Sequence, residues 1–324
     1  MTTWLLRRLM QAALVVLAMT VIVFIGVNVI GDPVEILISP EADQAERIRA
    51  VAALGLDKPL WQQYLYFLWG ALHGDLGRSF VFNEPALRLI TERMPATMEL
   101  AVTAVLLSIV LGIPLGLYAG LYPNSILGRT VMAGSILGFS LPSFWVGLML
   151  IMVFAVQLGW LPSTGRGATL PLFGVQFSFL TRDGLAHMVM PALNLALGNI
   201  ALVLRLTRAG VRENLPMDYV KFAHAKGLSP VRVVFVHVMK NIMIPIVTVI
   251  GLEFGSTIAF AVVTESVFAW PGMGKLIIDS INVLDRPVIV AYLMMIVLLF
   301  TAINLLVDLL YTVLDPRVRL ESAE

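Results

Sequence analysis

The chain has 324 residues, of which 59% are hydrophobic and 13% charged, whereas a soluble domain carries about 25% charged residues. Its mean hydropathy is +0.89. This composition excludes a disordered chain and argues against an ordinary water-soluble enzyme. The net charge of +1 gives no reason to expect a nucleic-acid partner. The absence of cysteine excludes disulfides, cysteine-ligated zinc and thiol catalysis.

Six apolar stretches have about the 20 residues that an α-helix needs to cross a bilayer. We place them at 9–30, 97–120, 131–157, 185–206, 242–265 and 288–313. The first follows Arg7 and Arg8, as in a signal peptide. It is too long for a signal peptide, however, and ends at Gly31-Asp32-Pro33 rather than at a cleavage site, so we expect a retained N-terminal transmembrane helix over 1–30. The predicted fold is therefore an all-α membrane protein with about six transmembrane helices.

Lysine and arginine in short loops predict the orientation of the spans. The segment 207–241 carries six basic and two acidic residues, whereas 159–184 and 266–287 are nearly balanced. With six spans, 207–241 shares a side with both ends of the chain, including the tail 314–324. We therefore expect a multi-pass protein of the cell inner (cytoplasmic) membrane with both termini cytoplasmic.

The segment 31–96 is expected to be external and helical. Glu41 to Leu54 reads as an amphipathic helix, and Pro59 opens a second helix with an apolar and aromatic stripe that stops at Gly74-Asp75-Leu76-Gly77. Two interpretations remain open. The segment either caps the spans or lies on the membrane surface, or it forms a docking surface for an external partner.

The segment 207–241 has helical patterning of its own. Asp218 to Gly227 reads as a helix with Tyr219, Phe222, Ala223 and Lys226 on one face and Gly227 as its C-cap. Ser229-Pro230 then begins another helix, with Ser229 as N-cap. Such an elbow suits a groove on a cytoplasmic subunit. A plain interfacial helix that binds anionic lipid is the alternative.

Small residues recur at spacing four inside the spans, which lets helix backbones approach closely in lipid. Helix packing is the expected role, with sliding surfaces in a moving pathway as the alternative. The pairs and triplets are Gly112, Gly116 and Gly120; Gly134 and Gly138; and Gly251 and Gly255.

Polar residues within the spans are candidates for lining a translocation path, since they are costly in lipid. Glu253 lies in the middle of the fifth span, and Asn194 and Asn199 lie in the fourth. Glu253 could also form a hydrogen bond between helices. The asparagines serve more often as such interhelical contacts.

An ordered set of motifs resembles the permease subunit of binding-protein-dependent ABC importers of the dipeptide/oligopeptide/nickel class, B-type. The set begins with Arg7-Arg8 and Gly31-Asp32-Pro33 and covers nearly the whole chain. Two departures are Lys221-Phe222-Ala223, where the general importer loop has Glu-Ala-Ala, and His224, where the peptide branch commonly has Arg. The other matching segments are Leu54–Pro59, Gly74–Ser79, Pro95–Leu100, Leu161–Gly165, Asp218–Leu228 and Thr264–Gly274.

The resemblance implies a type I importer permease fold, with an external insertion after the first helix and a core transmembrane domain over 97–313. It implies a coupling helix docked on an ATPase subunit, carried by Asp218, Tyr219, Lys221, Ala223, His224, Ala225, Lys226, Gly227 and Leu228. It also implies an external family motif at Glu265, Trp270, Pro271, Gly272 and Gly274. The implied partners are a second, C-type permease subunit, two subunits that bind ATP and Mg, an external solute-binding protein and membrane lipid.

We expect no catalytic residue, cofactor or metal on this chain. Gly272-Met273-Gly274-Lys275-Leu276 lacks the first glycine and the Ser/Thr of a P-loop, and neither HExxH nor GxSxG occurs. The expected function is to form half of the translocation pathway of an ATP-driven importer by alternating access, for dipeptides or oligopeptides. A secondary transporter driven by an ion gradient, a membrane-embedded hydrolase and an ion channel are the rival classes.

Overall fold

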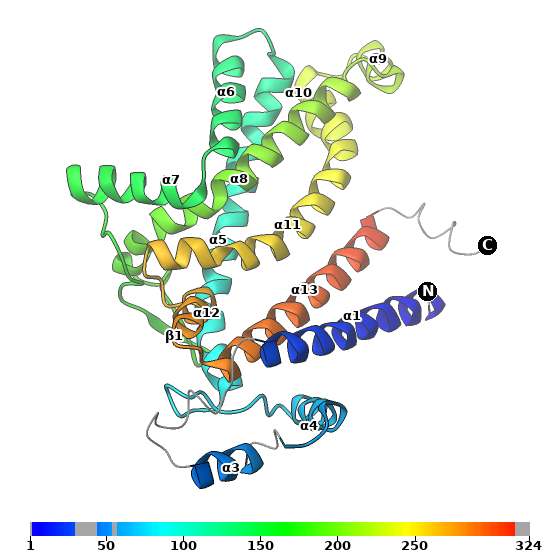
Figure 1. The fold of residues 1–324 in the computed structure, drawn as a ribbon. Coiled ribbons are helices and arrows are strands. Elements are labelled where there is room, and N and C mark those ends of the chain that lie inside the picture. Colours follow the sequence, from blue (N-terminus) through cyan, green and yellow to red (C-terminus); the bar gives the residue numbers. More distant parts are fainter. Residues whose placement is uncertain (1, 30–43, 54–56, 315–324) are drawn as a thin grey trace. The chain divides into compact units, whose positions relative to one another are not determined.

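The computed structural model describes residues 2–29, 44–53 and 57–314. The predicted motif Gly31-Asp32-Pro33, residues Leu54–Leu56 and the tail from 315 to 324 lie outside the described residues. Contacts divide the chain into two compact units, residues 1–95 with 272–302 and residues 96–271 with 303–324. Figure 1 shows the individual helices in chain order.

The first unit is built on membrane-length helices and short helices beside them. Val23, Val290 and Met294 form its small apolar cluster, against which Phe67 and Leu76 pack. Its elements are α1 (Thr2–Val29), α3 (Gln44–Ala53), α4 (Leu60–Leu72), the start of α5 (Ala86–Leu121), α12 (Met273–Asn282) and the part of α13 (Arg286–Leu314) up to residue 302. As expected, α4 starts after Pro59 and ends before Gly74, whose φ of +77° takes the chain out of the helix.

The second unit contains the rest of α5 and α13 and everything between them up to residue 271. A two-stranded antiparallel hairpin, β1 (Leu170–Leu172) and β2 (Val175–Phe177), precedes the long helix α8 (Arg182–Asn214). Its other elements are α6 (Ile126–Ser140), α7 (Ser143–Leu150), η1 (Ile151–Gln157), α9 (Asp218–Ala225), α10 (Pro230–Arg232), η2 (Val233–Val238) and α11 (Met239–Val267).

Five of the described helices are long and apolar enough to cross a membrane, and a bent pair raises the number to six. The third expected span, 131–157, is a bent pair of helices and not one straight helix, because α6 and the α7–η1 segment meet at 109°. Leu141 adopts extended backbone between them, with ψ of 135°. Pro142 explains the break, since a proline disfavours helical backbone at the preceding residue.

The helices also run past the expected span ends. α5 begins at Ala86, so the proposed domain boundary at 96/97 falls inside a helix of 36 residues, which is about 54 Å long. α8 continues to Asn214, past the expected end at 206. Apolar length alone locates the membrane-crossing part of a helix, whereas polar residues extend it beyond the bilayer.

Candidate functional site

The helix α9 and the turn after it form the elbow that the sequence indicates. Gly227 has φ of +75°, and its amide donates to the carbonyl of His224, which ends the helix in a left-handed residue. Ser229 then caps α10, its hydroxyl accepting from Arg232 N at 3.4 Å. The elbow is tied to α8, because Tyr219 Oη donates to Asn214 Oδ1 over 2.7 Å.

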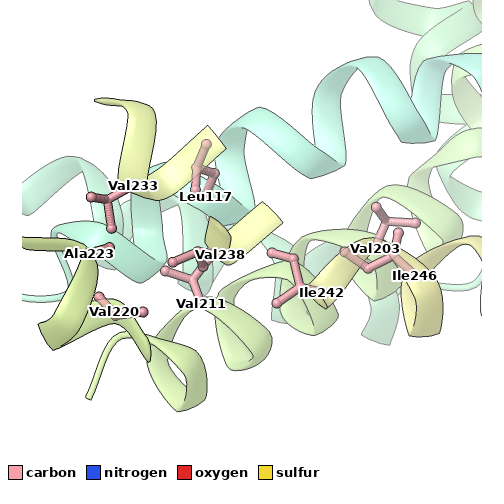
Figure 2. Close-up of a cluster of buried hydrophobic side chains, with 9 residues drawn as sticks. All are labelled: Leu117, Val203, Val211, Val220, Ala223, Val233, Val238, Ile242 and Ile246. Atoms are coloured by element: carbon pink, nitrogen blue, oxygen red, sulfur yellow. The ribbon is translucent and has the colours of Figure 1, made fainter. Parts of the chain in front are cut away.

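One side of α9 is fixed in an apolar cluster, shown in Figure 2. Val220 and Ala223 are 3% and 5% exposed. They belong to one cluster with residues from α5, α8, η2 and α11, namely Leu117, Val203, Val211, Val233, Val238, Ile242 and Ile246. A force applied to α9 would therefore act directly on the ends of several membrane helices.

The four residues that the sequence places on one face of α9 differ in burial. Ala223 is buried and Tyr219 half-buried, but the Phe222 side chain is 61% exposed. Lys226 lies over the Phe222 ring at 4.6 Å, and Lys221 pairs with Asp218 at 2.9 Å. A helix of eight residues has too few turns for its pattern to fix which face is buried. The exposed side of α9 is thus a basic surface around one aromatic ring.

The glycine stripe of α5 lies against α8. A Cβ added at Gly116 would lie 2.5 Å from the carbonyl oxygen of Leu204, and one at Gly112 would lie 2.9 Å from Val203. Gly120 is equally close to Val211, at 2.8 Å. On α11, a Cβ at Gly251 would lie 2.5 Å from Val307 of α13.

The remaining glycines of the spaced pairs differ from these. Gly255 is buried in α11. A Cβ at Gly134 or Gly138 of α6 would meet nothing within 4 Å. The α6 pair therefore has room that the α5 triplet lacks.

The candidate path residues fall into two places in the second unit. Asn199 of α8 and Glu253 of α11 border one small cavity of about 10 Å³ together with Ser108 of α5. Asn199 Nδ2 donates to Thr257 Oγ1 over 2.7 Å. Interhelical contact and cavity lining are thus both features of this site.

Asn194 lies elsewhere, beside a second cavity of about 420 Å³ bordered by α6, α7, α8 and α11. Its Nδ2 donates to Thr264 Oγ1 over 2.9 Å, while its buried Oδ1 has no hydrogen-bond partner. The rest of the lining is mainly apolar, with Phe139, Val146 and Phe260 among it. The structure therefore separates Asn194 from the pair Asn199 and Glu253.

A buried ion pair in the second unit is the strongest polar feature that the sequence analysis missed. Glu99 Oε2 accepts from Arg166 Nη2 over 2.8 Å, and Glu99 Oε1 accepts from the backbone amides of Ser178 and Phe179. Arg166 also lies over the Trp270 ring at 5.8 Å. The sequence feature that could have indicated this ion pair is Glu99, an acidic residue within an apolar stretch.

The expected external family motif is largely buried. Glu265 is fully buried and accepts from Thr97 Oγ1 over 2.6 Å, and Trp270, also fully buried, donates from Nε1 to the carbonyl of Ala96 over 3.0 Å. Gly272 and Gly274 are buried as well, and Pro271 is exposed. Glu265 and Trp270 thus hold the end of α11 and the turn after it against α5. Among the described residues, no group of three His, Asp or Glu side chains could hold a metal ion.

The chain matches two family models. One, described as "Binding-protein-dependent transport system inner membrane component", covers residues 112–320, and the N-terminal model of the same kind of component covers residues 1–101. A chain from "Inward facing conformations of the MetNI methionine ABC transporter" superposes with a TM-score of 0.54 at 18% identity, covering 72% of this chain and 99% of that one. That likeness shows the fold alone.

Curated relatives are similar over nearly their whole length. The chain is 39% identical to the dipeptide transport system permease protein DppB of Escherichia coli strain K12, covering 98% of this chain and 99% of that protein. The di/tripeptide transport system permease protein DppB of Pseudomonas aeruginosa is also 39% identical, with the same coverage. The glutathione transport system permease protein GsiC of E. coli K12 is 36% identical, again over 98% and 99%.

Proposed function

Because this chain belongs to the family of binding-protein-dependent transport system inner membrane components, we propose that it is the permease subunit of an ATP-driven importer of dipeptides or oligopeptides. The names of the relatives support this substrate class, since two transport dipeptides or di/tripeptides and one transports glutathione. A polar peptide cannot cross hydrocarbon unassisted, because each unpaired backbone group costs several kcal/mol there.

The proposal assigns the energy source and the other half of the pathway to separate chains. Two partner subunits bind ATP and Mg, a second, C-type permease completes the path, and an external solute-binding protein delivers the peptide. The open surface at Gly134 and Gly138 of α6 supports a further helix packing there, because small residues at this spacing admit close approach in lipid.

In this proposal α9 is the coupling helix. The observation that carries this assignment is that one side of α9 is buried and the other is exposed. Val220 and Ala223 fix one side in the cluster of membrane-helix ends, while Phe222, Lys221 and Lys226 remain on the surface. Movement of an ATPase subunit bound to Phe222 would be passed to α5, α8 and α11 through packed side chains. The basic surrounding segment is consistent with a cytoplasmic location for α9 and for both termini.

The translocation path in this proposal is lined by Glu253 and Asn199, with Asn194 as a separate polar point. Glu253 and Asn199 support it by lining one cavity in the middle of membrane-length helices. Opening and closing of the two permease subunits around these groups would give alternating access.

A matched pair of substitutions tests the coupling helix. Phe222→Ala and Phe235→Ala remove the same side chain from positions that are each 61% exposed. The chain is purified with its copurifying subunits and reconstituted in vesicles, and dipeptide uptake and ATPase activity are measured with ATP or with an ion gradient alone. We expect Phe222→Ala to lose most of both activities, and Phe235→Ala to keep them.

Three results would contradict the proposal. Wild-type uptake and ATPase activity in Phe222→Ala would remove α9 as the coupling element. Uptake driven by an ion gradient without ATP would indicate a secondary transporter. ATP-driven uptake that excludes dipeptides and oligopeptides would leave the family assignment intact and overturn the substrate class.

A further inference from the structure

The helix α4 carries an exposed apolar surface that the transport proposal does not use. Its thirteen residues contain no charged side chain. Four large side chains at helical spacing, Trp61, Leu65, Trp69 and Leu72, are 63%, 53%, 66% and 74% exposed. They form the apolar face of α4. Trp61, Leu65 and Trp69, with Gln62 and Tyr66, border a groove of about 510 Å³. Exposed apolar patches of this kind mark an interaction site.

A second face of α4 fixes the helix at membrane depth. Tyr64 Oη lies 2.8 Å from Thr20 Oγ1, and the Tyr64 ring contacts the Phe24 ring at 5.4 Å. Both partners lie in the half of the apolar segment Leu6–Gly26 that is far from the N-terminus. Phe67 also packs on the cluster that contains Val23. α4 therefore lies beside the end of a membrane span and not out in solution.

A third face of α4 is polar. Gln62 and Tyr66 follow the apolar face around the helix, and Lys58 lies over the Tyr66 ring at 4.3 Å. Tryptophan and tyrosine with a flanking lysine are the residues that gather at the boundary between lipid tails and headgroups. α4 thus shows one face to protein, one to an apolar phase and one to a polar phase.

The opposite side of α1 indicates the apolar phase. Ile22 and Ile25, on the side of α1 away from Thr20 and Phe24, are 59% and 55% exposed. α1 is a membrane-length helix, so these side chains face lipid. α4 therefore packs on one side of a helix whose opposite side is apolar and exposed, as a helix in contact with lipid requires.

We propose that α4 is an interfacial anchor, lying in the membrane leaflet opposite the N-terminus. Trp61, Leu65, Trp69 and Leu72 enter the acyl-chain region, and Lys58 and Tyr66 meet the phosphate and glycerol groups of the same lipids. The anchor holds the end of α1 at a fixed depth. It does not depend on the transported substrate or on the source of energy.

Single cysteines test this anchor cleanly, because the chain has none. Leu65→Cys and Trp69→Cys place a spin label on the apolar face, and Tyr66→Cys, at a position that is 63% exposed, is the control on the polar face. The full chain, with its copurifying subunits, is reconstituted in phosphatidylethanolamine–phosphatidylglycerol vesicles, and the cysteine-free parent gives the background. Collision with oxygen, which partitions into lipid, is compared with collision with a water-soluble nickel chelate, without substrate or nucleotide.

We expect the oxygen-to-nickel collision ratio at 65 and 69 to be several-fold higher than at 66. Equal ratios at all three positions would place the apolar face in water and overturn the anchor. Low collision with both reagents at 65 and 69 would show a protein covering the face, which also overturns it. As a second measurement, Leu65→Lys should lower the unfolding temperature in bilayers more than Gln62→Lys does, and an equal effect of the two lysines would contradict the proposal.

Discussion

Arg166 and Glu99, which are 67 residues apart in sequence, form an ion pair at 2.8 Å with side chains 14% and 1% exposed. The pair joins the segment between η1 and β1 to α5. Arg166 Nε also donates to Ser178 Oγ over 2.9 Å, and the amides of Ser178 and Phe179 complete the coordination of Glu99. These hydrogen bonds together hold the segment between η1 and α8 against α5, within the second unit.

Replacing this glutamate should be strongly destabilising. Glu99→Gln leaves Arg166 with a neutral partner in a buried place, and breaking such a pair costs about 3–5 kcal/mol. Glu92→Gln is the matched control on the same helix, because its pair with Arg88 is exposed and exposed pairs contribute about 0–1 kcal/mol. Denaturant unfolding in detergent measures the free energy of unfolding of both variants. Equal decreases in the two variants would show that the buried pair stabilises the protein no more than the exposed one.

The glycine stripe of α5 should tolerate no side chain. Gly116→Ala places a methyl group 2.5 Å from a backbone carbonyl of α8, which cannot move like a side chain, and overpacking costs about 1–3 kcal/mol. Gly134→Ala, whose added Cβ meets nothing within 4 Å, should leave the isolated chain at least as stable. Thermal unfolding of the two purified variants makes the comparison. A larger loss in Gly134→Ala than in Gly116→Ala would contradict the packing of α5 on α8.

Gly227, the left-handed residue after α9, should determine how stably the elbow is folded. Gly227→Ala forces a Cβ into φ of +75°, at a cost of about 1–2 kcal/mol, and Gly227→Trp imposes the same strain with a larger side chain. Gly198→Ala, inside α8 with open space around it, is the control. Hydrogen exchange of the α9 amides should be faster in both Gly227 variants, and uptake should fall while the protein stays in the membrane. Normal uptake and normal stimulated ATPase activity in Gly227→Trp would refute the coupling role.

Substitutions at Glu253 and Asn199 should distinguish a residue that lines the translocation path from one that only joins two helices. Glu253→Gln removes a charge but keeps the shape, so we expect lower peptide uptake with an unchanged unfolding temperature. Asn199→Leu breaks the 2.7 Å bond to Thr257, and hydrogen bonds between membrane helices contribute about 0.6–2 kcal/mol. Asn199→Leu should therefore lower the unfolding temperature. Unchanged uptake in Glu253→Gln would argue that this carboxylate lies outside the path.

The sequence was sufficient for the features that depend on neighbouring residues. Runs of apolar residues mark the membrane helices, and Pro59, Gly74, Gly227 and Ser229 mark where the short helices begin and end. Each of these signals acts through the backbone of its own turn. The ordered family motifs extend this local information along the whole chain.

Only the tertiary structure decided which side of each helix is occupied. Membrane helices are apolar all around, so their pattern does not reveal a buried face. The pairing of Glu99 with Arg166 and of Glu265 with Thr97 joins residues far apart in sequence. The burial of Val220, while Phe222 of the same helix stays exposed, depends on where α8 and η2 end. Local sequence carries no record of such contacts, because they form only when distant helices are packed together.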